Sequence, residues 1–289
     1  MTRPSEKSFG IAAALVLAAP VVVGTGYATA AALGLAGAGA TGQASLDRAV
    51  AVLTDPVVWG GTLWILWVAA ASTVLSAAIA IAIAVTFRGA GRLDALGRTL
   101  AVLPLPVPHL VAAVGGLLVL GQSGLIARVA FHLGFIDGPA AMPALVYDPA
   151  GIGLVLALTW KEVPFLTLVA VSVLATRGDA LERTARGLGA GRRDVFWRVT
   201  WPVLWRGLMP AAVAVFTFVA GSYEAAVILA PSDPLALPVL TWERFVDAGL
   251  GQRADAYVLA LLGFGIALAA VAVHEWVRAR IGLLDGGSA

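Results

Sequence analysis

The segment Arg177–Leu208, which reads RGDALERTARGLGAGRRDVFWRVTWPVLWRGL, decides how the rest of the chain is interpreted. It separates two long apolar runs and holds seven of the nineteen Lys and Arg residues of the chain. It is too long for a simple turn, and Gly187, Gly189 and Gly191 lie close together at its centre. Because clustered glycines end helices, the segment is expected to form two short helices joined at these glycines.

Both of these helices are predicted to be amphipathic. Asp179 is expected to cap the first helix together with Glu182, three residues later, as in a capping box. The second helix is expected to begin near Arg192 and to end before Pro202, because proline removes a backbone donor. The apolar faces comprise Leu181, Ala185 and Leu188 in the first helix, and Val195, Phe196 and Val199 in the second. From pattern and charge alone, an interfacial helix pair with Arg on lipid head groups is an alternative.

The remainder of the chain has the composition of a membrane protein. Of its 289 residues, 60% are hydrophobic and 12% are charged, and its mean hydropathy is +0.92. Soluble domains contain about 45–50% apolar and about 25% charged residues. The absence of Cys excludes thiolate nucleophiles, Cys-type zinc sites, iron–sulfur clusters and a disulfide scaffold. The net charge of +2 gives no indication of a nucleic-acid partner.

Six apolar stretches are long enough to cross a bilayer, which takes about 20 residues. They lie near Phe9–Leu35, Val57–Phe87, Thr99–Leu120, Ile152–Thr176, Met209–Ala230 and Ala256–Val277. With the N-terminus inside, the inner segments hold fourteen Lys and Arg residues and the outer segments four, while Lys161 lies within a span. This asymmetry predicts six spans with both ends in the cytoplasm. The first stretch also resembles a cleavable signal peptide ending near 28–30, which is the alternative for the N-terminus.

The central segment resembles the EAA loop of permease subunits of ABC importers. Thr184-Ala185-Arg186-Gly187-Leu188-Gly189-Ala190 and Phe196-Trp197-Arg198-Val199-Thr200-Trp201-Pro202 carry the resemblance, with Ala185, Gly189 and Pro202 at the family's spacing. Arg183 and Thr184 stand where the family usually has Glu and Ala, and Glu182 lies one residue earlier. The proline-rich stretch 104–109 is similar to the family's third core helix. Tyr147-Asp148, the stretch 160–165, Tyr223-Glu224 and 231–234 resemble the branch that transports spermidine/putrescine, thiamine or ferric iron.

The resemblance implies an all-α membrane protein of the type I ABC importer permease architecture in the cytoplasmic (inner) membrane. Residues 1–56 would form a first span with an outer loop. Residues 57–289 would form a permease core of five spans with the coupling loop at 177–208. The resemblance also implies three protein partners: ABC ATPase subunits, a second permease, and a periplasmic or lipid-anchored solute-binding protein. The second permease is expected to be a different chain, with a homodimer as the alternative.

Coupling to the ATPase would be carried by ten residues of the central segment. These are Glu182, Arg183, Thr184, Ala185, Leu188, Gly189, Ala190, Phe196, Val199 and Pro202. The chain has no Gly-x-x-x-x-Gly-Lys-Ser/Thr phosphate loop. It is therefore expected to be a non-catalytic transport subunit without a cofactor of its own, and the partner ATPase would bind ATP and magnesium.

Ionisable residues within the spans are candidates for the translocation path, because a charge at the bilayer centre is costly. Lys161 and Glu162 lie in the fourth span and Tyr223 and Glu224 in the fifth. A structural ion pair between Lys161 and Glu224 is the alternative. His109 either lines the path or packs against a neighbouring helix. The charge of the solute and its identity stay open.

The link Gly121–Gly151 is predicted to contain a short helix on the outer face. Ser123 would cap this helix and Gly134 would end it. Together with the polar loop Pro231–Asp255 it would form a rim that docks a solute-binding protein, or else a passive surface. The competing functions are a secondary transporter or channel, for which no internal repeat is evident, and an intramembrane enzyme, for which no cluster of carboxylates is evident.

Overall fold

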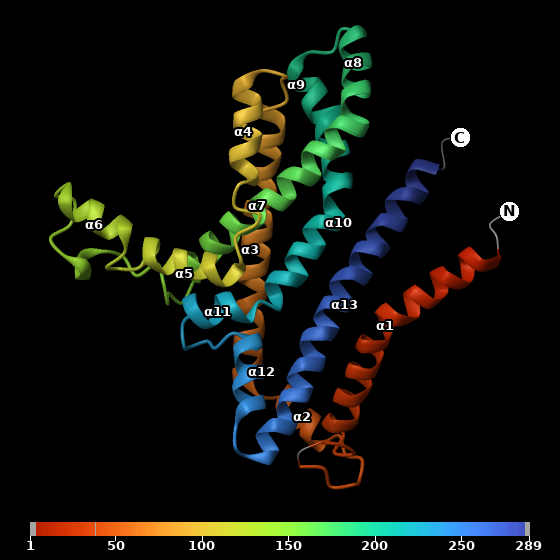
Figure 1. The fold of residues 1–289 in the computed structure, drawn as a ribbon, viewed down its shortest axis with the longest axis vertical. Coiled ribbons are helices and arrows are strands. Elements are labelled where there is room, and N and C mark those ends of the chain that lie inside the picture. The colour runs from red at the N-terminus through yellow and green to blue at the C-terminus, as the bar shows by residue number, and fades with distance from the viewer. Residues whose placement is uncertain (1–3, 38, 287–289) are drawn as a thin grey trace.

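The computed structural model describes residues 4–37 and 39–286, and every described element is a helix (Figure 1). The side chains of residues 4–7, 177, 179, 250 and 281–286 lie outside the described part of the structure. The helices and helical turns are α1 (Pro4–Ala32), α2 (Asp47–Leu53), α3 (Pro56–Thr86), α4 (Arg92–Val102), α5 (His109–Leu120), α6 (Leu125–His132), η1 (Pro139–Ala141), α7 (Ile152–Val173), η2 (Leu174–Gly178), α8 (Asp179–Gly187), α9 (Arg192–Val195), η3 (Phe196–Thr200), α10 (Trp201–Ala220), α11 (Tyr223–Leu229), α12 (Leu237–Val246) and α13 (Leu250–Gly286).

Six helical segments in the described residues are long and apolar enough to cross a membrane. They are Ser8–Ala32, Pro56–Thr86, His109–His132, Ile152–Thr176, Arg192–Ala220 and Gly251–Arg280. The predicted number of spans is therefore confirmed. In Figure 1, the N-terminal end of α1, the C-terminal end of α13 and the pair α8–α9 all lie toward one end of the long axis. The α2 segment and the turn between α12 and α13 lie toward the other end.

The core of the bundle is the contact between α3 and α7. Val68 and Ala69 of α3 and Leu166 and Ala170 of α7 are completely buried. Small residues let helices approach closely in a membrane, and α10 also packs against α3 and α7. Gly207 of α10 lies so near α7 that a Cβ atom there would come within 2.6 Å of Val173. The outer helix α1 packs against α13.

The third predicted span, Thr99–Leu120, is wrong as a continuous helix. It is divided between α4, a half-exposed helix, and α5, and residues 103–108 join the two. Prolines at 104, 106 and 108 remove backbone donors and fix φ, so the helix cannot continue through them. The hydropathy of the stretch does not report this interruption, because proline and its apolar neighbours are compatible with the bilayer.

The fifth span also differs from its prediction. The apolar helix begins before Met209 and ends at Ala220, and Gly221 and Ser222 separate it from α11. The stretch Pro231–Asp255, predicted as a loop, contains α12 and the beginning of α13. Helix α12 packs along α13 through buried residues such as Leu237 and Leu240, so this outer segment is part of the folded bundle.

The short helix predicted after Gly121 is confirmed as α6, and its location on the outer face stays a prediction. Gly134 has a left-handed φ of 74° just after the helix, as expected for its end. The predicted Ser123 cap is wrong, since Gly124 occupies the N-cap position and no side chain caps it. Figure 1 shows α5 and α6 leaving the bundle to one side.

Candidate functional site

The segment between α7 and α10 is a compact helical loop whose tip is exposed. Helix α8 ends in two hydrogen bonds, from the Gly189 N–H to the Arg186 carbonyl and from the Ala190 N–H to the Ala185 carbonyl, each 3.0 Å long. This pattern is the Schellman motif, which requires a left-handed residue. Gly189 provides it with φ +87°, and no atom lies within 4 Å of where its Cβ would be. The adjacent Leu188 is 84% exposed, so an apolar side chain protrudes from a well-defined turn.

Glu182 connects this loop to the rest of the protein. It is 4% exposed. Its two carboxylate oxygens accept hydrogen bonds from both terminal nitrogens of Arg88, at 3.0 and 2.7 Å. Arg186 donates a further bond of 3.0 Å to Oε2, and the Thr200 hydroxyl donates to Oε1. Because Arg88 follows the end of α3 and Thr200 lies before α10, one carboxylate joins three parts of the chain.

The electrostatics of this cluster keep Glu182 ionised. Burial raises the pKa of the carboxyl. The hydrogen bonds from Arg88 and Thr200 and the charges of Arg88 and Arg186 outweigh burial, so the pKa lies below its ordinary value of 4.5. The three arginines Arg88, Arg183 and Arg186 line a cavity of about 370 Å³ next to it.

The predicted capping box does not describe this segment. The side chain of Asp179 lies outside the described residues, but α8 has no separate beginning there, because α7 continues into it through the π-helical turn η2. Glu182 bonds with Arg88 and Thr200, which are 94 and 18 residues away in sequence. Neither partner was predicted from the sequence. Arg88 could have been noted as the first basic residue after the second span, although sequence does not reveal its long-range partner.

The helix that follows the loop does not end before Pro202, so that prediction is wrong. Helical structure continues from α9 through the π-helical turn η3 into α10, and Pro202 lies in the first turn of α10. Proline within a membrane helix is tolerated where a local π-helical adjustment satisfies the freed backbone groups, and η3 lies directly before Trp201 and Pro202. Trp197, Trp201 and Trp205 follow one another along this helix with ring centroids 6.0 Å apart.

The other predicted coupling residues lie around the same loop. Arg183 and Thr184 are exposed, and Ala185, Ala190, Phe196, Val199 and Pro202 are half-buried. Together with the exposed Leu188 and Gly189, they surround the Glu182 cluster or follow it along the chain. Figure 1 shows α8 and α9, which carry most of these residues or flank them, at one end of the long axis.

A second cluster lies at the interruption of the third span. His109, the first residue of α5, has its Nε2 3.0 Å from Oε1 of Glu162 on α7. The Lys161 ammonium donates to the carbonyl of Leu105 at 3.1 Å. The His109 ring also packs on Phe218 of α10, with centroids 4.6 Å apart. His109 therefore packs on a neighbouring helix and also meets a buried carboxylate, while its place in the translocation path stays a prediction.

Tyr223 and Glu224 begin α11, just after the interruption of the fifth span. Tyr223 packs against Trp242 with ring centroids 5.7 Å apart. Glu224 is exposed. The alternative ion pair between Lys161 and Glu224 is not formed in the described structure, because Lys161 bonds to Leu105 instead. The structure thus brings His109 and Glu162 together and leaves Glu224 apart from them.

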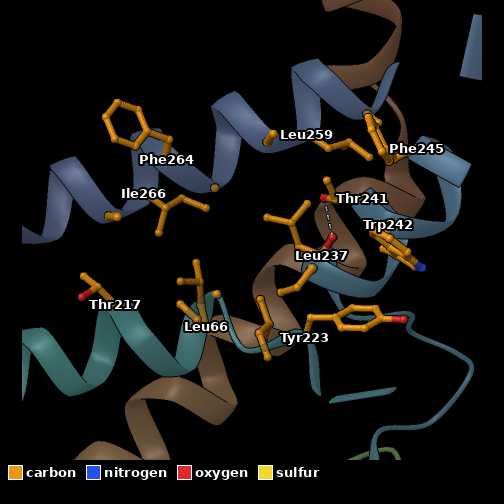
Figure 2. A pocket seen from close by; sticks show the side chains of 18 of the residues that line it. Leu66, Thr217, Tyr223, Leu237, Thr241, Trp242, Phe245, Leu259, Phe264 and Ile266 are labelled. Carbon is orange, nitrogen blue, oxygen red and sulfur yellow. Dashed lines mark hydrogen bonds between the residues drawn. The ribbon is translucent and has the colours of Figure 1, made fainter. Parts of the chain in front are cut away.

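The largest cavity described lies on the α13 side of α3 and α10. It has a volume of about 630 Å³ and an apolar lining from α3, α10, α12 and α13. Figure 2 shows Tyr223, Trp242 and Phe245 at one end and Phe264 and Ile266 at the other. The Thr241 hydroxyl donates to the Leu237 carbonyl at 2.7 Å, so this polar group is already used within α12. None of the charged path candidates lines this cavity.

Ion pairs at the opposite end of the bundle from the loop join three helices. Asp255 accepts from Arg48 at 3.0 Å and from Arg244 at 3.3 Å, which joins α2, α12 and α13. Trp64 of α3 donates to the carbonyl of Pro149 at 2.7 Å and anchors the loop before α7. Among the described residues, no group of three or more His, Cys, Asp and Glu could hold a metal ion.

Comparisons with known proteins agree with this architecture. The family model described as binding-protein-dependent transport system inner membrane component matches residues 76–282. The molybdenum transport system permease protein ModB of Mycobacterium tuberculosis is 32% identical over 183 residues, which are 63% of this chain and 66% of ModB. The thiamine transport system permease protein ThiP of Brucella abortus is 30% identical over 177 residues, 61% of this chain and 31% of ThiP. The chain thus spans less than two thirds of the length of these relatives.

A solved structure supports the fold over nearly the whole chain. It is the crystal structure of a bacterial alginate ABC transporter in complex with an alginate pentasaccharide-bound periplasmic protein. One of its chains superposes with a TM-score of 0.72, covering 96% of both chains at 15% sequence identity. At this identity the likeness concerns the fold.

Proposed function

Because the chain belongs to the family of binding-protein-dependent transport system inner membrane components, we propose that its loop 177–208 couples solute import to a separate ATPase. The chain is a multi-pass permease component of an ABC importer in the cytoplasmic membrane. The proposed N-in and C-in orientation places this loop in the cytoplasm. Its positively charged residues then follow the usual bias toward the inner face.

The observation that carries the coupling proposal is the combination of an exposed tip and a fixed base. Leu188 protrudes from the Schellman turn, and Glu182 holds the base through Arg88 and Thr200. An apolar side chain that inserts into a groove of a partner transmits force only if its own segment is held in place. The tip would insert into the ATPase, and the Glu182 cluster would pass its movement to α3 and α10.

We further propose that the solute path passes the junction of α5, α7 and α10. His109, Glu162 and Phe218 meet there, and both interrupted spans change direction nearby. Irregular backbone within a membrane is tolerated where protein buries it or where it lines a cavity. Glu224, exposed at the start of α11, would face the same path.

Three partners and the division of the chain remain part of the proposal. A second permease would complete the path, ATPase subunits would bind the coupling loop, and a solute-binding protein would dock on the outer rim that Asp255 stabilises. Residues 1–56 would form a peripheral span, with the permease core in 57–289. The names of the relatives point to molybdenum or thiamine as the solute class. These two solutes differ in charge, so the path residues do not decide between them.

The coupling proposal is tested by purifying the tagged chain from its native membrane and measuring how much ATPase subunit accompanies it. We expect Leu188→Asp to lose the ATPase, because a charge would enter an apolar contact. Leu133→Asp is the matched control, since Leu133 is also exposed, at 64%, but lies at the C-terminal end of α6, away from the loop. Equal recovery of ATPase with both variants would refute the docking of this loop.

The path proposal predicts that Glu224→Gln alters uptake while membrane insertion stays normal. The side chain is exposed, so removal of its charge is expected to leave the bundle intact. Uptake of radiolabelled molybdate and of thiamine by vesicles is compared with the amount of inserted protein. Normal uptake kinetics for the transported solute would assign Glu224 to the surface of the bundle.

A further inference from the structure

Two adjacent charged residues of α7 are almost fully buried within the membrane-spanning bundle. Lys161 and Glu162 are each 7% exposed. Neighbouring residues on a helix point about 100° apart, so the two side chains reach different places. Both places belong to the interruption between α4 and α5, namely the carbonyl of Leu105 and the ring of His109.

The contact with Leu105 replaces a hydrogen bond that the interruption removes. In a continuous α-helix, the carbonyl of residue 105 would accept from the N–H of residue 109. The chain leaves helical geometry at Pro108, where ψ is 147°, so this arrangement is lost. The Lys161 ammonium donates to the Leu105 carbonyl at 3.1 Å instead. A buried carbonyl without a donor is costly, and a charged donor gives a stronger bond than a neutral one.

The contact with His109 fixes the other side of the interruption. Glu162 lies 3.0 Å from Nε2 of His109, which is the first residue of α5. The same ring packs on Phe218, three residues before α10 is interrupted at Gly221. The direction of α5 and its contact with the fifth span therefore depend on where α7 holds His109.

We propose that Lys161 and Glu162 are positioning residues that hold the interruption of the third span and thereby set the His109–Phe218 contact. They would act on the solute path through the backbone of 103–108 and through His109, without touching the solute. This role gives the two buried charges complementary tasks: the cation satisfies a carbonyl, and the anion orients a ring.

The inference about transport rests on the proposed function. The inference that Lys161 and Glu162 fix the interruption at residues 103–108 does not. Helix α4 packs against α3 and α7, so it stays attached to the core if Lys161 is lost. Helix α5 itself packs against α7 and α11, so the loss of Lys161 removes a restraint on the angle between α4 and α5 at residues 103–108. The two helices should occupy a wider range of relative positions, which is a measurable property in the absence of solute or ATP.

The test measures the distance between α4 and α5 with a pair of spin labels. The chain contains no Cys, so Leu96→Cys and Val114→Cys can be labelled selectively, and both positions are exposed. The transporter is purified with its accompanying subunits and reconstituted in lipid nanodiscs. We expect one narrow distance distribution for this parent protein.

Two pairs of variants separate positioning from general stability. Lys161→Met and Glu162→Leu remove the two contacts. Lys161→Arg can still donate to the Leu105 carbonyl, and Glu162→Gln can still form a hydrogen bond with the His109 ring. In the removing variants, we expect the ratio of molecules at the parent distance to molecules at other distances to fall about tenfold. This change in ratio corresponds to about 1.4 kcal/mol. The retaining variants should restore it. Thr159→Val on the same helix removes a buried hydroxyl that has no partner in the described structure and is the matched control.

Narrow parent-like distributions in both removing variants would overturn the proposal. Equal broadening in the retaining variants, or in Thr159→Val, would also overturn it, because the effect would then reflect disturbance of α7 in general. A separate measurement of ATP hydrolysis by the copurified subunits tests the proposed function. If the copurified subunits do not hydrolyse ATP but the removing variants still broaden the distance distribution, the import mechanism is rejected while the positioning of α5 remains supported.

Discussion

The Glu182 cluster gives a quantitative prediction for Glu182→Gln. The amide keeps the size of the side chain but loses the charge that Arg88 and Arg186 contact. A hydrogen bond to a charged group contributes about 1.5–3 kcal/mol. Arg186 is 60% exposed, so its share is largely screened by solvent, whereas Arg88 is 24% exposed and contributes most. We estimate that local opening of α8 becomes easier by about 2 kcal/mol.

Hydrogen exchange of the α8 amides measures this opening. When reclosing is fast, the exchange rate follows the population of the open form, so about 2 kcal/mol corresponds to about 30-fold faster exchange in α8. Asp194→Asn is the control, because it disrupts the exposed pair with Arg198, in which the side chains are 57% and 82% exposed. Such surface pairs contribute little. Similar exchange in both variants would show that Glu182 does not anchor the loop.

Three further predictions concern Glu182, Gly189 and Gly207. The pKa of Glu182 is lowered in the folded protein, so the stabilisation of the loop by this carboxylate is present above pH 4.5 and is lost as the pH falls from 4.5 through the lowered pKa. The mobility of a spin label at Leu188, followed against pH, measures this loss. Gly189→Val should strain the turn by about 1–2 kcal/mol without a clash, because Val disfavours a left-handed conformation. It should reduce uptake per ATP hydrolysed, and unchanged uptake would contradict the coupling role. Gly207→Ala should lower the thermal midpoint because its Cβ would come within 2.6 Å of Val173, whereas Gly115→Ala, which has open space, should not.

The sequence predicts what depends on composition and local spacing. The apolar stretches give six spans, and Gly134 and Gly189 mark helix ends because each adopts a left-handed conformation. The interruption at 103–108 was predictable in principle from the three prolines, but a hydropathy window treats it as part of a span. The backbone geometry of proline decided the structure there.

The site depends on contacts that sequence spacing does not report. Glu182 fits a capping box by local pattern, yet its charge is satisfied by Arg88 from the end of another helix. Lys161 suggested an ion pair with Glu224, yet a carbonyl exposed by prolines is its acceptor. In both cases the partner is a group that the sequence pattern did not indicate. A buried charge is costly unless it is hydrogen-bonded, so it bonds with whichever suitable group the fold brings near it.

The two π-helical turns lie side by side at the base of the loop 177–208. Leu174–Gly178 precedes α8 and Phe196–Thr200 precedes α10, and the two turns are in contact. Each turn is wider than an α-helical turn, because its hydrogen bonds join residues five apart. Leu174 and Thr200 of these turns are buried. A force on the exposed tip of the loop would therefore reach α7 and α10 together, through two turns that pack against each other.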